Sequence, residues 1–147
     1  MLLSWNSLQT PLEGVTAAQL EAVFGEPEAI TVEAGTAFTL PAEAPRTAFL
    51  VVSGALHGGG GELRLMPELA VPRREIAGLG RLILGEAVEH AFAVAETTVL
   101  VALDGLRLEG ACTEGDAAAQ AIFDAVVMLL SVDLRSSNEA LQTLLQS

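Results

Sequence analysis

Two glutamates and two histidines are the residues of this chain whose types and spacing could do acid–base or metal chemistry. Glu86 and Glu89 lie close enough in the sequence to form a carboxylate pair, the arrangement that general acid–base catalysis uses. His57 and His90 are the only histidines, and neither has a second histidine at the spacing that a metal centre requires. Without a metal or a basic partner, the two carboxylates are expected to form a solvated acidic rim, and no metal site is predicted.

No motif for a nucleophile or a phosphate loop is present. Cys112 is the only cysteine and lies in a polar, glycine-containing connection, so a free structural thiol is expected there. Ser53 and Gly54 lack the preceding glycine of a G-x-S-x-G motif. The "HGGGG" of residues 57–61 is not followed by Gly-Lys-Ser/Thr and is expected to be a flexible hairpin tip. The sequence therefore predicts a protein that is not an enzyme and needs no cofactor.

The charge of the chain limits its partners. Nineteen acidic residues and seven arginines, with no lysine, give a formal net charge of −12. Binding to nucleic acid requires clustered basic residues, and the only adjacent pair is Arg73-Arg74, which Glu75 follows. The most apolar segment, residues 117–132, is shorter than a bilayer span of about 20 residues and contains Gln120 and Asp124. We expect no direct nucleic-acid partner and no membrane span, and the single thiol without a secretory pattern predicts a cytoplasmic protein.

The patterns along the chain predict a helix followed by a series of short strands. Thr16 and Gln19 form a capping box ahead of a short amphipathic helix over residues 17–24. From residue 29 the apolar residues recur with a period of two, and turn residues interrupt the pattern every 8 to 12 residues. The expected strands cover residues 30–33, 37–40, 46–56, 62–66 and 91–103, and residues 73–80 allow another short strand and turn. The turn residues Ser53 and Gly54 close the strand of 46–56, which is expected to form a hairpin with 62–66. This pattern predicts a mainly β chain with flanking helices, folded as an antiparallel β-roll or jelly roll.

The C-terminal segment, residues 116–147, contains neither glycine nor proline and is expected to be one long helix. A stripe formed by Ile122, Val126 and Leu129 widens its apolar face in the first half, where we expect it to pack against the roll. A second set of residues follows a heptad spacing that is typical of a coiled coil and predicts a dimer seam, with a helix folded back on its own domain as the alternative. The seam consists of Phe123, Val127, Leu130, Leu134, Ser137, Leu141 and Leu144.

In its order of elements the chain resembles the cyclic nucleotide-binding domain family, in the form found in bacterial Crp/Fnr-type regulators. Four segments carry the resemblance, which covers the chain from about Leu12 to its end. They are "ITVEAGTAF" (30–38), which resembles the first strand and its glycine turn; "AFLVVSGAL" (48–56), a central strand; "GRLILGE" (80–86), the Gly-Glu turn; and "AFAVAETTVLVAL" (91–103), the strand after it. The resemblance implies a β-roll sensory domain over residues 1–115 and a dimerisation helix over residues 116–147.

The resemblance also implies a ligand site at the Gly-Glu turn. Gly85 and Glu86 match the turn whose glutamate takes the ribose hydroxyl in the family. With Ala91 as the strand alanine, the position of the phosphate-binding arginine is occupied by Glu89, and the connection before it is shortened. Two charges about 4 Å apart interact by roughly 4 kcal/mol at an effective dielectric constant near 20, so this reversal turns an attraction into a repulsion. A cyclic phosphate is therefore not expected to bind in the family manner.

Four further residues could complete a modified pocket. Arg81 could swing toward the turn, and His90 could carry a positive charge below about pH 6.5. Ser137 and Asn138 match the two helix residues that reach the adenine in the bacterial regulators, although Ser137 is as easily explained as a break in the seam. The residues expected to line such a pocket, for a small molecule that the sequence does not identify, are Arg81, Gly85, Glu86, Glu89, His90, Ala91, Ser137 and Asn138.

These observations predict a non-enzymatic sensory or protein-interaction domain that forms a homodimer through its C-terminal helix. Family regulators carry a DNA-reading module after that helix, and this sequence ends at Ser147, so regulation is expected to pass through a protein partner or a full-length homologue. The alternative is a genuine receptor module for cyclic AMP, cyclic GMP or another small ligand in a signalling or transcription-regulatory system. A cupin-like enzyme is a third possibility, which the missing metal ligands disfavour.

Overall fold

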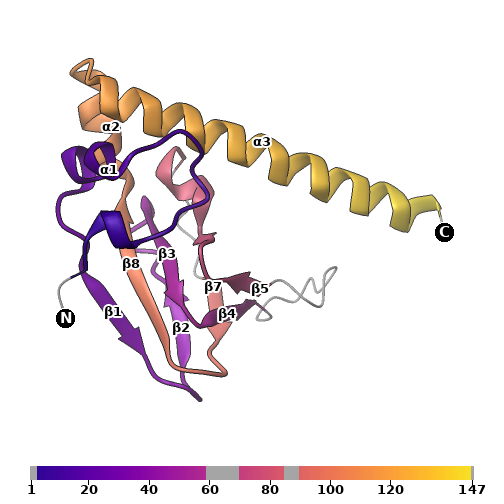
Figure 1. Cartoon of the computed structure of the whole chain (residues 1–147). Coiled ribbons are helices and arrows are strands. Elements are labelled where there is room, and N and C mark those ends of the chain that lie inside the picture. Colours follow the sequence, from indigo (N-terminus) through magenta and orange to yellow (C-terminus); the bar gives the residue numbers. More distant parts are fainter. Residues whose placement is uncertain (1–2, 59–69, 85–89, 147) are drawn as a thin grey trace.

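The alternating strands form a β-roll, and the helices gather at one end of it in the computed structural model of the chain (Figure 1). The structure describes residues 3–58, 70–84 and 90–146, and the side chains within these ranges except those of residues 58, 70, 90 and 133–146. In chain order the elements are η1 (Trp5–Ser7), α1 (Ala17–Phe24), β1 (Ala29–Val32), β2 (Ala37–Leu40), β3 (Thr47–Ser53), β4 (Ala55–Gly58), β5 (Ala70–Pro72), β6 (Ile76–Ala77), η2 (Leu79–Leu82), β7 (His90–Ala93), β8 (Thr98–Asp104), α2 (Gly105–Thr113) and α3 (Ala117–Gln146).

The described strands pair into two antiparallel sheets. One sheet has the order β1-β8-β3-β6 and the other has the order β2-β7-β4-β5. Apart from β4 and β5, the described strands that follow one another in sequence belong to different sheets, so the chain passes back and forth between the two layers of the roll. The prediction of a mainly β, antiparallel roll with flanking helices and a long C-terminal helix is confirmed.

The middle of strand β3, residues 48–51, is entirely apolar because it is covered on both faces. Ala48 and Leu50 pack into a core shared with the helices, whereas Phe49 and Val51 pack into a second core between the two sheets. Side chains alternate between the faces of a strand, so neighbouring residues of β3 serve different cores. Phe49 also meets the ring of Phe38 from β2 edge to face, with the ring centroids 4.9 Å apart.

The expected strand at residues 91–103 was wrong because it contains a turn, whereas the turn expected at Ser53 and Gly54 is confirmed. Residues 46–56 divide at Gly54, whose φ of 81° is left-handed and where a Cβ would lie 2.8 Å from the carbonyl oxygen of Thr97. Residues 91–103 divide into β7 and β8, since Val94 exchanges backbone hydrogen bonds with Gly35 and Thr36 and the chain then turns. Apolar residues flank the turn after Val94 on both sides, so the pattern suggested one long strand there.

The hairpin expected between residues 46–56 and 62–66 stays a prediction, whereas the loop tip expected to begin at residue 57 was wrong. Leu56 lies opposite Val71 of β5, and His57 lies opposite both Ala70 and Ala93, so His57 is a strand residue and not part of a loop tip. The expected strand at residues 62–66 lies outside the described residues. Pairing of β4 with β5 and β7 places His57 in the middle of a sheet.

Helices α1 and α3 lie where the sequence predicted helices, whereas α2 was not predicted. The capping box of Thr16 and Gln19 is present at α1, and Ile122 and Val126 of α3 are fully buried, as predicted. The connection expected around Cys112 is instead helix α2, which Asp104 caps by accepting a hydrogen bond from the backbone N–H of Leu106. None of the helices that the structure describes has the length and hydropathy needed to cross a membrane.

Candidate functional site

Only part of the predicted ligand site lies within the described residues. Gly85, Glu86 and Glu89 fall outside them. His90 and Ala91 begin β7 and lie opposite Leu40 and Thr39 of β2, and Ala91 is exposed; the side chain of His90 is not among those described.

Arg81, the arginine expected to swing toward the turn, is held inside the protein. It lies in η2 and is completely buried. Its Nη1 atom donates to the backbone carbonyl oxygens of Pro41 at 2.8 Å and of Ala44 at 3.3 Å. The side chain thereby ties η2 to the connection between β2 and β3. To swing away toward any other group, the Nη1 atom would have to leave both carbonyl oxygens.

The helix residues of the predicted site lie on α3. Ser137 and Asn138 are in its second half, where only the backbone is described, and the same holds for Leu134, Leu141 and Leu144. Of the described seam residues, Val127 is 40% exposed, and Phe123 and Leu130 are half-buried. Of the predicted site, the structure thus describes the side chains of Arg81 in η2 and Ala91 in β7. Whether the Gly-Glu turn meets Ser137 and Asn138 of α3 stays a prediction.

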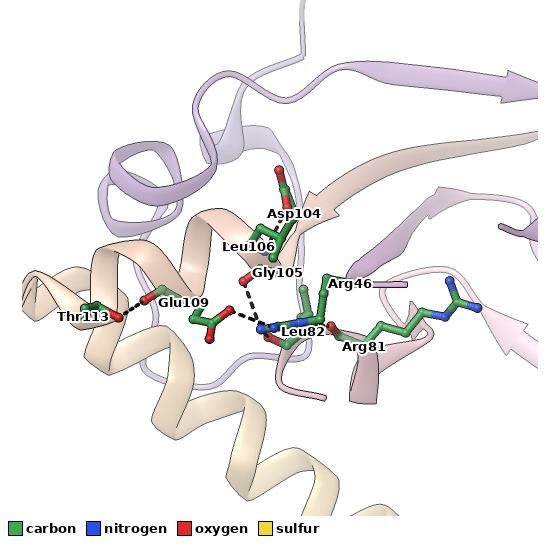
Figure 2. Close-up of polar contacts among 8 residues, drawn as sticks. All are labelled: Arg46, Arg81, Leu82, Asp104, Gly105, Leu106, Glu109 and Thr113. Atoms are coloured by element: carbon green, nitrogen blue, oxygen red, sulfur yellow. Dashed lines mark hydrogen bonds and ion pairs between the residues drawn. The ribbon is translucent and has the colours of Figure 1, made fainter. Parts of the chain in front are cut away.

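An arginine that sequence reasoning missed, Arg46, connects η2 to α2. Its Nε donates to the carbonyl oxygen of Arg81 at 3.1 Å, and its Nη2 donates to those of Leu82 at 3.1 Å and Gly105 at 3.3 Å. Its Nη1 forms an ion pair with Oε2 of Glu109 at 2.9 Å (Figure 2). These acceptors lie 35 to 63 residues away in the sequence, so no local pattern could reveal them. The only feature of the sequence that points to Arg46 is its position directly before an apolar strand, in a chain with seven basic residues.

Gly105 makes this junction possible by bringing three backbones together. Its N–H donates to the carbonyl oxygen of Arg46 at 2.8 Å. A Cβ at this position would lie 2.6 Å from that oxygen and 3.0 Å from both the carbonyl oxygen of Arg81 and the Cα of Leu82. Only glycine therefore fits at the start of α2 without displacing η2 or the residue before β3. We call Arg46, Gly105, Glu109 and the η2 residues Arg81 and Leu82 the helix junction.

Cys112 lies on α2, is half-buried and packs against the helix-side core. Burial raises the pKa of its thiol, and the negative charges of Asp116 and Asp124 raise it further. Such a thiol is a poor nucleophile, because the thiolate is the reactive form. No group of three or more histidine, cysteine, aspartate or glutamate side chains suited to hold a metal ion occurs in the described parts of the chain.

Neither a protein-family model nor a curated protein sequence matches this chain. Solved structures do match its fold. One is a protein from Geobacter metallireducens assigned to the cyclic nucleotide-binding proteins, with a TM-score of 0.64 and 17% identity over 84% of this chain and 91% of that one. A second is the catabolite activator protein of Thermus thermophilus, with a TM-score of 0.64 and 20% identity over 92% of this chain. The matched region is 63% of that activator's length.

A third match is the N-terminal domain of a transcriptional regulator from Streptomyces coelicolor, with a TM-score of 0.60 and 20% identity over 89% of this chain and 90% of that domain. The three proteins share the order of roll and helices described above, at sequence identities that show the fold alone. The chain has the fold of cyclic nucleotide-binding domains and of the sensor domains of Crp/Fnr-type regulators.

Proposed function

We propose that this chain is a non-enzymatic sensory or protein-interaction domain that pairs through α3 and does not hold a cyclic nucleotide in the manner of the family it resembles. The fold is the starting point, because it is shared with bacterial regulators and their sensor domains. A fold alone does not define an activity, so the proposal depends on features of this chain's own helix and pocket.

The observation that carries the proposal is the extension of α3 past the roll (Figure 1). In its first half, Ala119, Ile122 and Val126 are fully buried against the protomer. Residues 133–146 continue as helix beyond that contact. Isolated helices shorter than roughly 12 to 15 residues are only marginally stable in water. An extension of this length is expected to need a packing partner, and its leucines at heptad spacing favour another copy of the same helix.

Two features argue against the usual nucleotide. In sequence, Glu89 stands where the family has its phosphate-binding arginine. In the structure, the neighbouring cation Arg81 is buried and donates to the carbonyl oxygens of Pro41 and Ala44. A cyclic phosphate would therefore meet a carboxylate, and recruiting Arg81 would break the bonds that hold the β2–β3 connection.

Sedimentation velocity tests the pairing. We expect the wild-type chain to sediment as a dimer at micromolar concentration, and Val127→Glu to sediment as a monomer because it places a charge in the seam. Met128→Glu is the matched control, since Met128 is 67% exposed and lies on another face of α3. A wild-type monomer, or loss of the dimer in Met128→Glu but not in Val127→Glu, would contradict the proposed seam.

A further inference from the structure

A cleft opens where η2, α2 and α3 meet, on the outer side of the helix junction. Its volume is about 310 Å³, and it is lined by the ion pair of Arg46 and Glu109 and by the apolar side chains of Leu82, Ile83, Leu108 and Phe123. Small-molecule sites span about 300 to 1,000 Å³, so this cleft is suited to a ligand at the small end of that range. Of the described residues that line the cleft, none belongs to the pocket predicted at the Gly-Glu turn.

The polar end of the cleft is a fixed positive charge. The side chain of Arg46 is only 17% exposed, and the carbonyl oxygens of Arg81, Leu82 and Gly105 accept three of its N–H groups. A guanidinium has five N–H groups in a rigid fork. A fourth goes to Glu109, which leaves one Nη1 hydrogen beyond the bonds that the described residues make with Arg46. The guanidinium of Arg46 is thus held in one orientation, and its Nη1 atom can donate a second hydrogen bond.

The carboxylate that now occupies Nη1 is easily displaced. The side chain of Glu109 is 59% exposed, and exposed ion pairs contribute little to stability. Its backbone position in α2 is unaffected by rotation of the side chain into solvent. A ligand carboxylate would therefore replace Glu109 on the same nitrogen, with the advantage of a more buried hydrogen bond, since charge-assisted bonds strengthen away from water.

The rest of the cleft is suited to hydrocarbon. Leu82 and Leu108 are at most 1% exposed, and Ile83 and Phe123 are half-buried beside them. Leu82 and Leu108 therefore form a closed floor, and Ile83 and Phe123 provide the apolar surface that a hydrocarbon chain can reach, so each methylene that leaves water there increases affinity by up to about fourfold. The combination of a fixed guanidinium and an apolar wall selects an amphipathic anion.

We propose that this cleft is a binding site for a small apolar monocarboxylate, whose carboxylate takes the place of Glu109 on Arg46 and whose hydrocarbon chain packs between η2, α2 and α3. Such a ligand would contact the helix junction and the first half of α3 at once. It would therefore fix the orientation of α3 relative to the roll. The described residues that line the cleft all belong to one protomer, and only Phe123 among them is also a residue of the predicted seam, so the carboxylate end of the site does not depend on the proposed pairing.

Cys112 provides a direct readout, because it lines the cleft and is the only cysteine. The experiment measures the rate at which N-ethylmaleimide modifies Cys112, and the melting temperature, in the full chain with octanoate below its micelle concentration. We expect octanoate to slow the modification and raise the melting temperature in a saturable manner, whereas octan-1-ol at equal concentration does neither. Affinity should rise with chain length from butanoate to octanoate, by at most about fourfold per methylene.

Two variants on α2 separate a specific site from a general effect of charge. Glu109→Gln removes the competing carboxylate and should tighten octanoate binding by about 5- to 10-fold. Glu114→Gln removes the same charge from the end of the same helix, outside the cleft, and should leave the affinity within about twofold. The monomeric variant Val127→Glu should bind octanoate as the wild type does, which keeps this test separate from that of the dimer.

Three results would overturn the proposal. One is equal protection of Cys112 by octanoate and octan-1-ol, which would reduce the cleft to an apolar surface without a carboxylate site. Another is the absence of protection by any member of the series. The third is an equal gain in affinity in Glu109→Gln and Glu114→Gln, which would assign the effect to long-range charge.

Discussion

Replacing Gly105 by alanine tests whether the helix junction is as tightly packed as its backbone distances indicate. A Cβ there would lie 2.6 Å from the carbonyl oxygen of Arg46 and 3.0 Å from backbone atoms of Arg81 and Leu82. These are main-chain atoms that cannot rotate away. Forcing an extra methyl group into a packed site costs typically 1 to 3 kcal/mol, and the hydrogen bonds of Gly105 with Arg46 would be strained as well. Alanine is favoured over glycine in helices by at most about 1 kcal/mol, so the clash prevails.

We expect Gly105→Ala to lower the free energy of unfolding by about 1 to 3 kcal/mol, and the melting temperature by roughly 2 to 12 °C for a chain of this size. Gly110→Ala in the same helix is the control, because no atom lies within 4 Å of a Cβ at that position. That variant should gain up to about 1 kcal/mol from helix propensity. Urea and thermal unfolding of both variants provide the measurement. If Gly105→Ala melts at or above the wild-type temperature, the reasoning about the junction is refuted.

Two other predictions concern the neighbours of Gly105. Arg46→Lys should lower the free energy of unfolding by about 2 to 4 kcal/mol, because an ammonium cannot donate to all three carbonyl oxygens and each buried unsatisfied acceptor costs about 1 to 3 kcal/mol. Glu109→Ala, which removes only the exposed ion pair, should lower it by at most about 1 kcal/mol. Equal losses for the two variants in urea unfolding would show that the ion pair dominates. Cys112, whose folded pKa is raised, should destabilise the protein at alkaline pH. The unfolded chain loses the thiol proton first, near pH 8.5, so the free energy of unfolding should fall above that pH until the folded pKa is passed. The chain has no lysine and no tyrosine, so comparing the wild type with Cys112→Ala at pH 7.5 and pH 10 isolates this thiol; an equal loss of stability in both proteins would contradict the assignment.

Local signals predicted the parts of the fold that local chemistry determines. The capping box of Thr16 and Gln19 defined the start of α1, and its residue range agrees with the sequence. The stripe of Ile122 and Val126 predicted the face of α3 that is buried. Period-two patterning predicted the roll. In each case the residues that carry the signal are neighbours along the chain, so the sequence contains the whole interaction.

The features that were missed depend on contacts between distant segments. Helix α2 contains Gly105 and Gly110, which lower helix propensity, and Gly105 is there because Arg46 and η2 approach it closely. The break in residues 91–103 depends on hydrogen bonds from Val94 to a turn near residue 35. The role of Arg46 depends on acceptors far along the chain. The predicted contacts of Glu86, Glu89, Ser137 and Asn138 remain predictions.

Thermal unfolding of the purified chain with and without millimolar cyclic AMP and cyclic GMP tests the central claim most directly. A ligand present at about 100 times its dissociation constant stabilises the native state by about 2.7 kcal/mol, which raises the melting temperature by several degrees. Because the resemblance places Glu89 at the position of the phosphate-binding arginine and Arg81 donates hydrogen bonds to Pro41 and Ala44, we expect no saturable shift with either nucleotide. A saturable rise in the melting temperature with either one would contradict the claim and identify the chain as a nucleotide receptor.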